Sequence, residues 1–344
     1  MAAKKHVYTF ICMVGLSAGL MSAAHAAGEV ESFYRGKTME FIVGYGAGGG
    51  YDLYARLVAQ QLNNFIPGRP TLIVRNMPGG GGRVATSYVY RVAPQDGTIL
   101  LTADQSLILD QALGDSSVQF DLSKMPAIGN PIAENNNLVT WYTSGIRSID
   151  DAKTREIPIG AGPGASTQVP LAMNAILGTK FKIISGYTGG NEINLAMERG
   201  EVAGRGQNSF AAWRASKPDW LKDGKINFIV QWGMSKLPGY ENVPLLSELA
   251  KTPDDNALLS LFSVPTTLGR PIFTTPNVPT ERVAALREAF EKMIHSKEFT
   301  DLAQKGGFDL NPVSGPQMQE AIGSALNTPP RIRERLKKII ETTL

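Results

Sequence analysis

The residues with the most evident chemical use form a glycine-rich turn, Gly44-Tyr45-Gly46-Ala47-Gly48-Gly49-Gly50-Tyr51-Asp52. An apolar, strand-like run at residues 39–43 precedes the turn, and a helical pattern follows from Asp52. Such a turn lets backbone N–H groups approach a ligand closely and presents the positive end of the helix dipole to an anion. For Asp52, a structural role as the helix N-cap is the alternative. We predict that a carboxylate binds at Gly46, Ala47, Gly48, Gly49, Gly50, Tyr51 and Asp52.

A second turn of the same kind, Gly162-Pro163-Gly164-Ala165-Ser166-Thr167-Gln168, joins a predicted strand to a predicted helix. Its hydroxyl groups suit either helix capping or donation to a ligand. Two further loops, residues 187–191 and 207–209, carry amide side chains that fit the walls of a cleft. Each turn taken singly also fits an ordinary loop. The predicted ligand-binding residues of this second group are Gly164, Ala165, Ser166, Thr167, Gln168, Gly190, Asn191, Gln207 and Asn208.

The first 26 residues have the pattern of a secretory signal peptide. Lys4 and Lys5 precede an apolar run at residues 7–21, and Ala24-His25-Ala26 then provides a small-x-small cleavage site. A membrane anchor is the alternative, but a run of about 15 residues is shorter than the roughly 20 needed to span a bilayer. No later segment contains about 18 consecutive apolar residues. We predict cleavage near Ala26/Ala27 and a periplasmic location.

The first turn also matches a dinucleotide-binding fingerprint at Gly44, Gly46 and Gly49. That fingerprint requires an acidic residue at the end of the second strand, where it binds the ribose. The second predicted strand, residues 71–76, ends in Arg75-Asn76 instead. An arginine there suits a 2′-phosphate, but export takes the chain away from the cytoplasmic cofactor pool. We therefore expect no dinucleotide and no other cofactor.

Cleavage would remove most of the residues that support catalysis or metal binding. The only cysteine, Cys12, and two of the three histidines, His6 and His25, lie in the predicted signal peptide. His295 remains, near the end of a predicted helix, where a cation favours the helix dipole. One histidine without cysteine cannot form a thiol nucleophile or a multi-histidine zinc site. The remaining 32 basic and 31 acidic residues give a net charge of +1 and no electrostatic surface for nucleic acid. We predict a protein that is not an enzyme and binds no metal.

Strands and helices alternate along the chain, which predicts an α/β fold. At 344 residues, with 43% hydrophobic and 19% charged residues, the chain exceeds the usual size of one core. Short connections between strands and helices predict parallel sheets covered on both faces. We expect a first lobe of residues 27–133 plus 260–344 and a second lobe of residues 134–259. The predicted strands are residues 39–43, 71–76, 98–102, 138–142, 157–160, 182–185 and 228–231.

Two features allow two interpretations each. The basic stretch at residues 331–338 alternates with isoleucine and leucine at helical spacing, which fits a docked amphipathic helix or a helix on a membrane surface. Trp213 follows the loop at residues 207–209 and fits either a hydrophobic core or a stacking surface for a planar ligand. For both, packing against the protein is the first expectation.

A series of short motifs follows the first turn in a fixed order: Arg75-Asn76-Met77-Pro78-Gly79-Gly80, Pro94-Gln95-Asp96-Gly97-Thr98, Gly186-Tyr187-Thr188-Gly189-Gly190, Gly200-Glu201-Val202 and Thr275-Pro276-Asn277-Val278-Pro279. With the two glycine turns, this series resembles the tripartite tricarboxylate transporter receptor family, also called Bug proteins. The resemblance covers essentially the whole chain after the predicted signal peptide. It implies a type II periplasmic binding protein fold, in which two α/β lobes close over a ligand cleft. It also implies a monomer that delivers a di- or tricarboxylate or an aromatic acid to integral-membrane permease subunits, without catalysis.

The chain departs from the family pattern at four positions. Ala47 stands where proline is common, Gln168 where histidine is common, and Ala203 and Gly204 where an aspartate is often found. These departures bear on the specificity for the ligand. Two other functions stay open: a binding protein that signals to a membrane sensor kinase, and an exported hydrolase or oxidoreductase with the glycine turns as an anion hole. The second alternative lacks an evident base.

Overall fold

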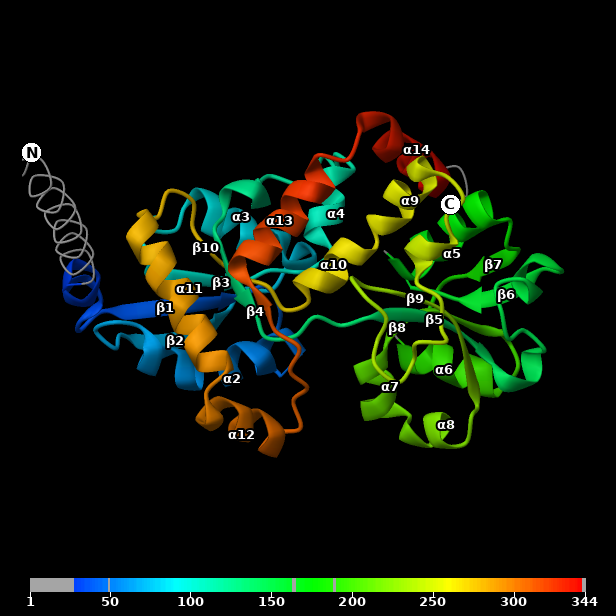
Figure 1. Cartoon of the computed structure of the whole chain (residues 1–344), viewed down its shortest axis with the longest axis horizontal. Coiled ribbons are helices and arrows are strands. Elements are labelled where there is room, and N and C mark those ends of the chain that lie inside the picture. Colours follow the sequence, from blue (N-terminus) through cyan, green and yellow to red (C-terminus); the bar gives the residue numbers. More distant parts are fainter. Residues whose placement is uncertain (1–27, 49, 163–164, 188–189, 342–344) are drawn as a thin grey trace, which may run out of the picture. The chain divides into compact units, whose positions relative to one another are not determined.

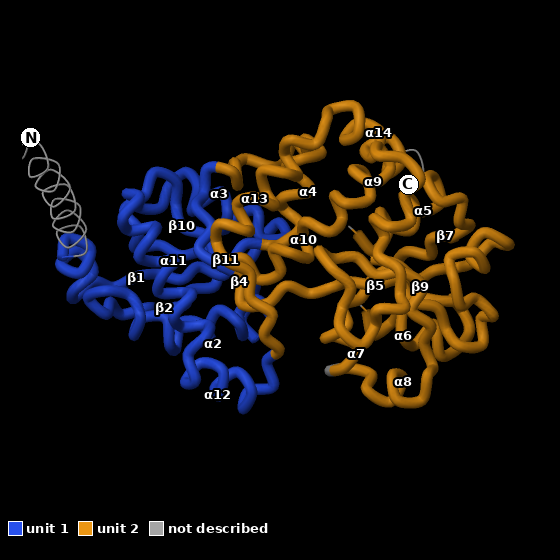
Figure 2. The backbone as a smooth tube through the Cα atoms, in the orientation of Figure 1, with its two compact units in different colours: residues 1–103, 124–129, 272–308 blue, residues 104–123, 130–271, 309–344 orange. Residues whose placement is uncertain are grey.

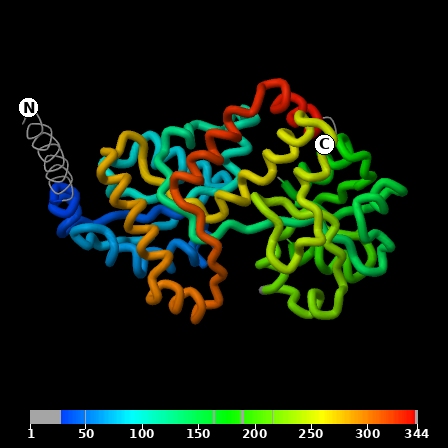
Figure 3. The backbone as a smooth tube through the Cα atoms, viewed as in Figure 1, coloured from blue at the N-terminus to red at the C-terminus, as the bar shows by residue number. Residues whose placement is uncertain are grey.

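The computed structural model describes residues 28–48, 50–162, 165–187 and 190–341 (Figure 1). The chain forms two compact units (Figure 2). Unit 1 comprises residues 1–103, 124–129 and 272–308, and unit 2 comprises residues 104–123, 130–271 and 309–344. The chain therefore passes from one unit to the other several times, and its path can be followed in Figure 3.

This division differs from the lobes expected from the sequence. Residues 104–123 and 309–344 belong to unit 2, although the sequence suggested that they lie in the first lobe. Which segments move together as a lobe stays a prediction.

Unit 1 contains a mixed sheet with the strand order β4-β10-β3-β1-β2. β1 (Thr38–Val43) is parallel to β2 (Thr71–Asn76) and to β3 (Ile99–Thr102), so the carboxyl ends of these three strands lie at one edge. β10 (Ile272–Thr274) is antiparallel to both β3 and β4 (Ala127–Asn130). The helices of unit 1 include α2 (Gly50–Phe65), α3 (Arg83–Arg91), α11 (Thr280–Ile294) and α12 (Lys297–Lys305), with a short 3-10 turn, η1, at Gly80–Gly82.

Unit 2 contains a second sheet with the strand order β7-β6-β8-β5-β9. β6 (Ile157–Gly160) is parallel to β7 (Phe181–Ile184) and to β8 (Gly204–Ser209). β5 (Asn136–Trp141) is antiparallel to β8 and to β9 (Ile226–Trp232). The helices of this unit are α4 (Leu107–Ala112), α5 (Ala165–Leu177), α6 (Gly190–Glu198), α7 (Phe210–Ser216), α8 (Pro218–Lys222), α9 (Pro253–Ser260), α10 (Ser263–Leu268), α13 (Gly315–Leu326) and α14 (Pro330–Glu341) in the described part of the chain. The unit also contains the short strand β11 (Val313–Ser314) and the 3-10 turns η3 (Tyr142–Ser144), η4 (Asp151–Lys153) and η5 (Leu246–Leu249). A further 3-10 turn, η2 (Leu122–Lys124), spans the boundary between the two units in the sequence.

The α/β fold is confirmed, but the expectation of purely parallel sheets is wrong. The crossover rule fixes the direction of a strand only where a helix links it to its parallel neighbour. β1, β2 and β3 obey that rule through α2 and α3. β10 enters unit 1 directly from a segment of unit 2, so no crossover helix sets its direction.

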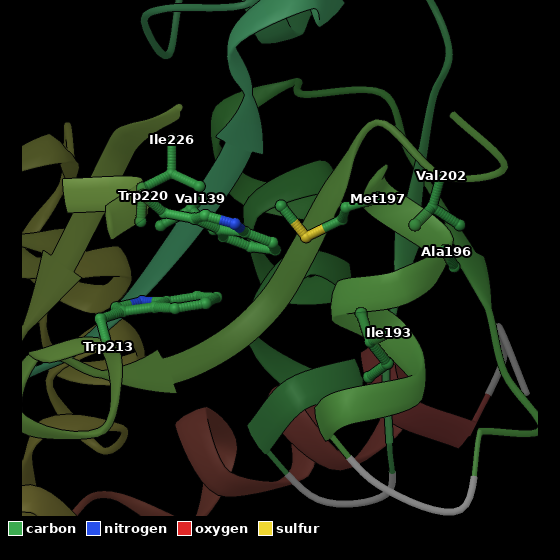
Figure 4. Close-up of a cluster of buried hydrophobic side chains, with 8 residues drawn as sticks. All are labelled: Val139, Ile193, Ala196, Met197, Val202, Trp213, Trp220 and Ile226. Carbon is green, nitrogen blue, oxygen red and sulfur yellow. The ribbon is translucent and has the colours of Figure 1, made fainter. Parts of the chain in front are cut away.

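A buried hydrophobic cluster that includes Trp213 and Trp220 connects β5 and β9 of the unit 2 sheet with α6, α7 and α8 (Figure 4). Trp213 is fully buried, and its Nε1 donates a hydrogen bond to Asn137 Oδ1 at 2.9 Å. Trp220 lies against Trp213 with ring centroids 5.9 Å apart, and Met197 belongs to the same cluster. Trp213 is therefore a core residue, and the alternative of a stacking surface for a ligand is wrong.

The basic C-terminal stretch forms α14, which packs on α5 and α9. Its apolar residues Ile332 and Leu336 are buried, and Arg331 makes two hydrogen bonds to the carboxylate of Asp254, at 2.6 and 2.8 Å. The docked interpretation of this helix is confirmed. Within the described ranges, no helix combines the length and hydropathy needed to cross a bilayer.

Candidate functional site

A cavity of about 330 Å³ lies in unit 2, where the parallel strands β6 and β8 end. In open α/β sheets this edge is the usual ligand site, because loops and helix starts converge there. Here the turn after β6 leads into α5, and the loop after β7 leads into α6. The cavity is lined by Gln105, Glu134, Asn136, Gly162, Ser166, Tyr187, Gly190, Ile193, Arg205, Gln207, Asn208, Ser209 and Arg270.

The turn between β6 and α5 is held by its own hydroxyl groups. Gly162 N donates a hydrogen bond to Ser166 Oγ at 3.2 Å, and Thr167 Oγ1 donates one to the Gly162 carbonyl at 2.7 Å. These bonds satisfy groups that a helix start otherwise leaves unpaired. Gly162 and Ser166 face the cavity, whereas Thr167 serves the turn itself.

β8 supplies the largest share of polar cavity residues. Side chains two positions apart share a face of a strand, so Arg205 and Gln207 both reach the cavity. Gly206, between them, faces α5, and a Cβ atom there would lie 2.1 Å from the Ser166 carbonyl oxygen. The close approach of strand and helix therefore requires glycine at this position.

Arg205 is the most unusual residue of the cavity. Its Nη1 donates to Asn194 Oδ1 at 3.1 Å and, over a longer 3.5 Å, to the Gly190 carbonyl, and its guanidinium lies 5.2 Å from the Trp213 ring centroid. Its Nε is buried without a hydrogen-bond partner, and Arg205 forms no ion pair with any described residue. Burial lowers the pKa of Arg205 to about 10, so the side chain stays cationic at neutral pH.

In unit 1 the glycine turn is organised by Asp52, which is buried at the start of α2. One carboxylate oxygen accepts hydrogen bonds from Gly48 N at 2.8 Å and Arg56 Nε at 2.9 Å, and the other accepts one from Asn76 Nδ2 at 2.8 Å. Asn76 Nδ2 also donates to the Tyr45 carbonyl at 2.9 Å. The network thus links the turn to the end of β2. The hydrogen bond from Arg56 contributes most to lowering the pKa of Asp52 to about 2, and the hydrogen bonds from Gly48 and Asn76 contribute less.

The other residues of this turn are arranged around that network. Gly46, Ala47 and Gly48 are exposed, and Gly48 has a positive φ of 80°. Tyr45 and Tyr51 stack on each other with ring centroids 4.7 Å apart. Gly49 lies outside the described residues. Asp52 lies in the first turn of α2 and not at its N-cap position, and its carboxylate is engaged by Gly48, Arg56 and Asn76. Its role in the structure is therefore to hold the turn, and a direct contact of Asp52 with a ligand stays a prediction.

No site for a metal ion is evident within the described ranges, because no group of three or more histidine, cysteine or acidic side chains converges there.

Comparisons with known proteins found relatives by sequence and neighbours by structure. No family model matches it. A UPF0065 protein of Cupriavidus necator is 25% identical over 317 residues, which make up 88% of this chain and 89% of that protein. A UPF0065 protein of Bordetella bronchiseptica is 25% identical over 244 residues, or 67% of this chain and 69% of that protein.

Solved structures with a similar fold include a solute-binding protein and a periplasmic binding protein. A TctC solute-binding protein from Polaromonas has a TM-score of 0.69 at 19% identity, over 90% of this chain and 99% of that one. The periplasmic binding protein BugD has a TM-score of 0.58 at 17% identity, over 89% and 98% of the two chains. The chain is thus similar in sequence to UPF0065 proteins and similar in fold to the TctC protein and BugD. An R. palustris protein solved with adipate has a TM-score of 0.58 at 20% identity, over 89% of this chain and 97% of that one.

The structure brings the predicted residues of unit 2 only partly together. Ser166, Gly190, Gln207 and Asn208 line the cavity. Ala165 and Thr167 lie in α5 beside it, and Asn191 is exposed in α6. Gln168 lines a separate hollow beside α14, and Gly164 lies outside the described residues.

The sequence reasoning missed several cavity residues. Arg205 and Arg270 carry its positive charges, and Glu134 carries its negative charge. A signal for Arg205 existed: it lies between two glycines inside the run Gly204-Arg205-Gly206-Gln207 that precedes a predicted binding loop. Nothing comparable marks Arg270 or Glu134. The remaining missed residues are Gln105, Asn136 and Ile193.

Proposed function

We propose that this protein is a periplasmic receptor that captures a small carboxylate. The observation that carries the proposal is the polar cavity of unit 2, which lies beside the starts of α5 and α6 and is lined by Ser166, Gln207 and Asn208. Helix starts and amide or hydroxyl side chains provide the hydrogen-bond donors that a carboxylate accepts. The adipate present in a structural neighbour supports the same class of ligand.

The proposal extends to delivery of the acid to the integral-membrane subunits of a tripartite tricarboxylate-type permease. The likeness to a TctC solute-binding protein and to BugD supports this role. Capture by hinge closure and a monomeric state also stay predictions.

A thermal-shift screen tests ligand capture. Protein stripped of ligand by partial unfolding and refolding is heated with adipate, malate, citrate or benzoate, and with adipamide as the uncharged control. A ligand that binds only the folded state stabilises it by about 2.7 kcal/mol at a hundredfold excess over Kd. We expect at least one acid to raise Tm by several degrees in a saturable manner, and adipamide to leave it unchanged. Failure of all four acids to shift Tm would contradict carboxylate capture.

A further inference from the structure

We propose that Arg205 binds a carboxylate group of the solute directly and thereby gives the cavity its preference for acids. The inference rests on the proposed function and adds the residue that recognises the charge.

The balance of charge in the cavity supports this role. Three of its lining residues are charged: Arg205, Arg270 and Glu134. Arg270 Nη2 lies 3.9 Å from Glu134 Oε1, and both side chains are largely buried, with exposed fractions of 18% and 16%. Burial raises the pKa of Tyr187, so its phenol stays neutral. The lining therefore has a net charge of +1, and Arg205 carries the excess.

The contacts of Arg205 hold it in place without neutralising it. Asn194 and the Gly190 carbonyl accept from one nitrogen, Nη1, and both are uncharged. The guanidinium lies over the Trp213 ring, 5.2 Å from its centroid, and Trp213 belongs to the hydrophobic core and does not line the cavity. Within the described part of the chain, Nε and Nη2 have no hydrogen-bond partner. Removing a cation from water without a counter-ion is costly, and a bound anion would offset that cost.

Gly190 is part of the same arrangement. A Cβ atom at this position would lie 2.4 Å from Nη2 of Arg205 and 2.7 Å from its Cζ. The absence of a side chain at the start of α6 therefore makes room for the guanidinium. Any larger residue would push the guanidinium away from its present position while leaving its charge unchanged.

The chemistry of the lining favours a carboxylate over a phosphate. A guanidinium pairs with the two oxygens of a carboxylate through parallel N–H donors. The single excess positive charge matches one carboxylate group, whereas a phosphate dianion would place two negative charges on one group beside Glu134. In a dicarboxylate such as adipate, the second negative charge lies on a separate group, away from the one that pairs with Arg205. Gln207, Asn208 and Ser166 are then available for the neutral polar groups of the solute.

Titration calorimetry with adipate, and separately with inorganic phosphate, tests the inference on the full mature protein. Arg205→Gln should weaken adipate binding by roughly ten- to hundredfold, because a hydrogen bond to a charged group is lost. Arg205→Lys should give an intermediate affinity, and Gly190→Ala should weaken binding as well. The matched control is Arg199→Gln, which removes the same charge from an exposed ion pair with Glu201 outside the cavity lining. Phosphate should bind more weakly than adipate.

The outcomes separate this inference from the proposed function. Adipate binding within about threefold of wild type in Arg205→Gln would overturn the role of Arg205 and leave the receptor proposal intact. Tighter binding of phosphate than of adipate would overturn the choice of carboxylate. If the wild type binds none of the four acids of the thermal screen, the proposed function fails and the inference fails with it.

A labelling experiment needs no variant and covers the case in which Arg205→Gln fails to fold. Wild-type protein is treated with phenylglyoxal, and modified arginines are located by mass spectrometry. Saturating adipate should reduce the modification of Arg205 at least about threefold and leave the exposed Arg199 unaffected. Equal modification of Arg205 with and without adipate, at a concentration that shifts Tm, would overturn the inference.

Discussion

Asp52, which is buried, and Arg205, which is partly buried, show how two charged residues serve different ends. Asp52 has partners for both carboxylate oxygens inside unit 1, and its hydrogen bonds fasten the glycine turn. Arg205 has only neutral partners in unit 2 and retains an unbalanced charge. A buried charge with full pairing contributes to stability, while one without a counter-ion suggests a ligand. This contrast explains why the two residues call for different measurements.

For Asp52 the expected measurement is of stability. Asp52→Asn should lower the free energy of unfolding at pH 7 by roughly 2 kcal/mol, since its pKa is near 2 against an ordinary 3.8 and each unit corresponds to about 1.4 kcal/mol. Because the folded-state pKa is depressed, this contribution is complete above about pH 4 and is lost as the pH falls through about 2. Urea titrations of wild type and variant at pH 7 and pH 3 should show the difference shrinking.

The matched control for that experiment is Asp309→Asn. Asp309 pairs with Arg214 on the surface, where both side chains are about half exposed. Such pairs contribute at most about 1 kcal/mol. Equal losses for the two variants at pH 7, or a difference that does not depend on pH, would contradict the role given to Asp52.

At the scale of elements, the cavity depends on how closely β8 approaches α5. Gly206→Ala would place a Cβ atom 2.1 Å from the Ser166 carbonyl, so the helix start or the strand must shift. We expect the variant to lose about 1 to 3 kcal/mol of stability, as overpacked sites do. We also expect a lower affinity for adipate, because Ser166 and Gln207 line the cavity. Urea denaturation and calorimetry measure the two effects.

Gly323→Ala is the control for this substitution. Gly323 lies within α13, and a Cβ atom there would meet nothing within 4 Å. Alanine is favoured over glycine in a helix, so this variant should gain about 0.5 to 1 kcal/mol. Wild-type stability in Gly206→Ala would show that the strand and helix are not packed as described.

The sequence was informative about elements and less so about side chains. The turn before α5 was predictable as an element, because glycine and proline between a strand pattern and a helix pattern indicate a turn. Gln168 falls outside the cavity because it lies two positions from Ser166, and residues two apart do not share a helix face. Arg205 was missed because an arginine in a strand is ordinarily solvent-exposed. Its contacts with Asn194 of α6 and Trp213 of α7 depend on how these helices pack, which the strand pattern does not show.

At the scale of the molecule, the directions of β10 and β5 were not predictable from local patterns. Alternation of strands and helices fixes strand direction only through crossover helices. β5 follows β4 after a short loop, and β10 follows α9 and α10 of unit 2, so no crossover helix links either strand to a parallel neighbour. The chain is similar in fold to BugD and to a TctC protein.

Export is the prediction that belongs to the whole molecule. We expect the protein recovered from the periplasm to lack residues 1–26, because the segment has a basic start, an apolar run and a small-residue cleavage site. Intact-mass measurement of the periplasmic fraction checks this directly. Substitution of Ala24 and Ala26 by bulky residues should leave the uncleaved precursor on the membrane. Recovery of the full-length chain in the cytoplasm would contradict a periplasmic receptor.

The central claim, that the protein is a receptor for a small carboxylate, is tested most directly by native mass spectrometry. Protein purified gently from the periplasm is analysed intact, and any retained small molecule is released and identified. The account predicts one equivalent of a small acid in the wild type and its loss from Arg205→Gln. A retained solute without an acidic group, or an identical acid content in both proteins together with an unchanged affinity, would contradict it.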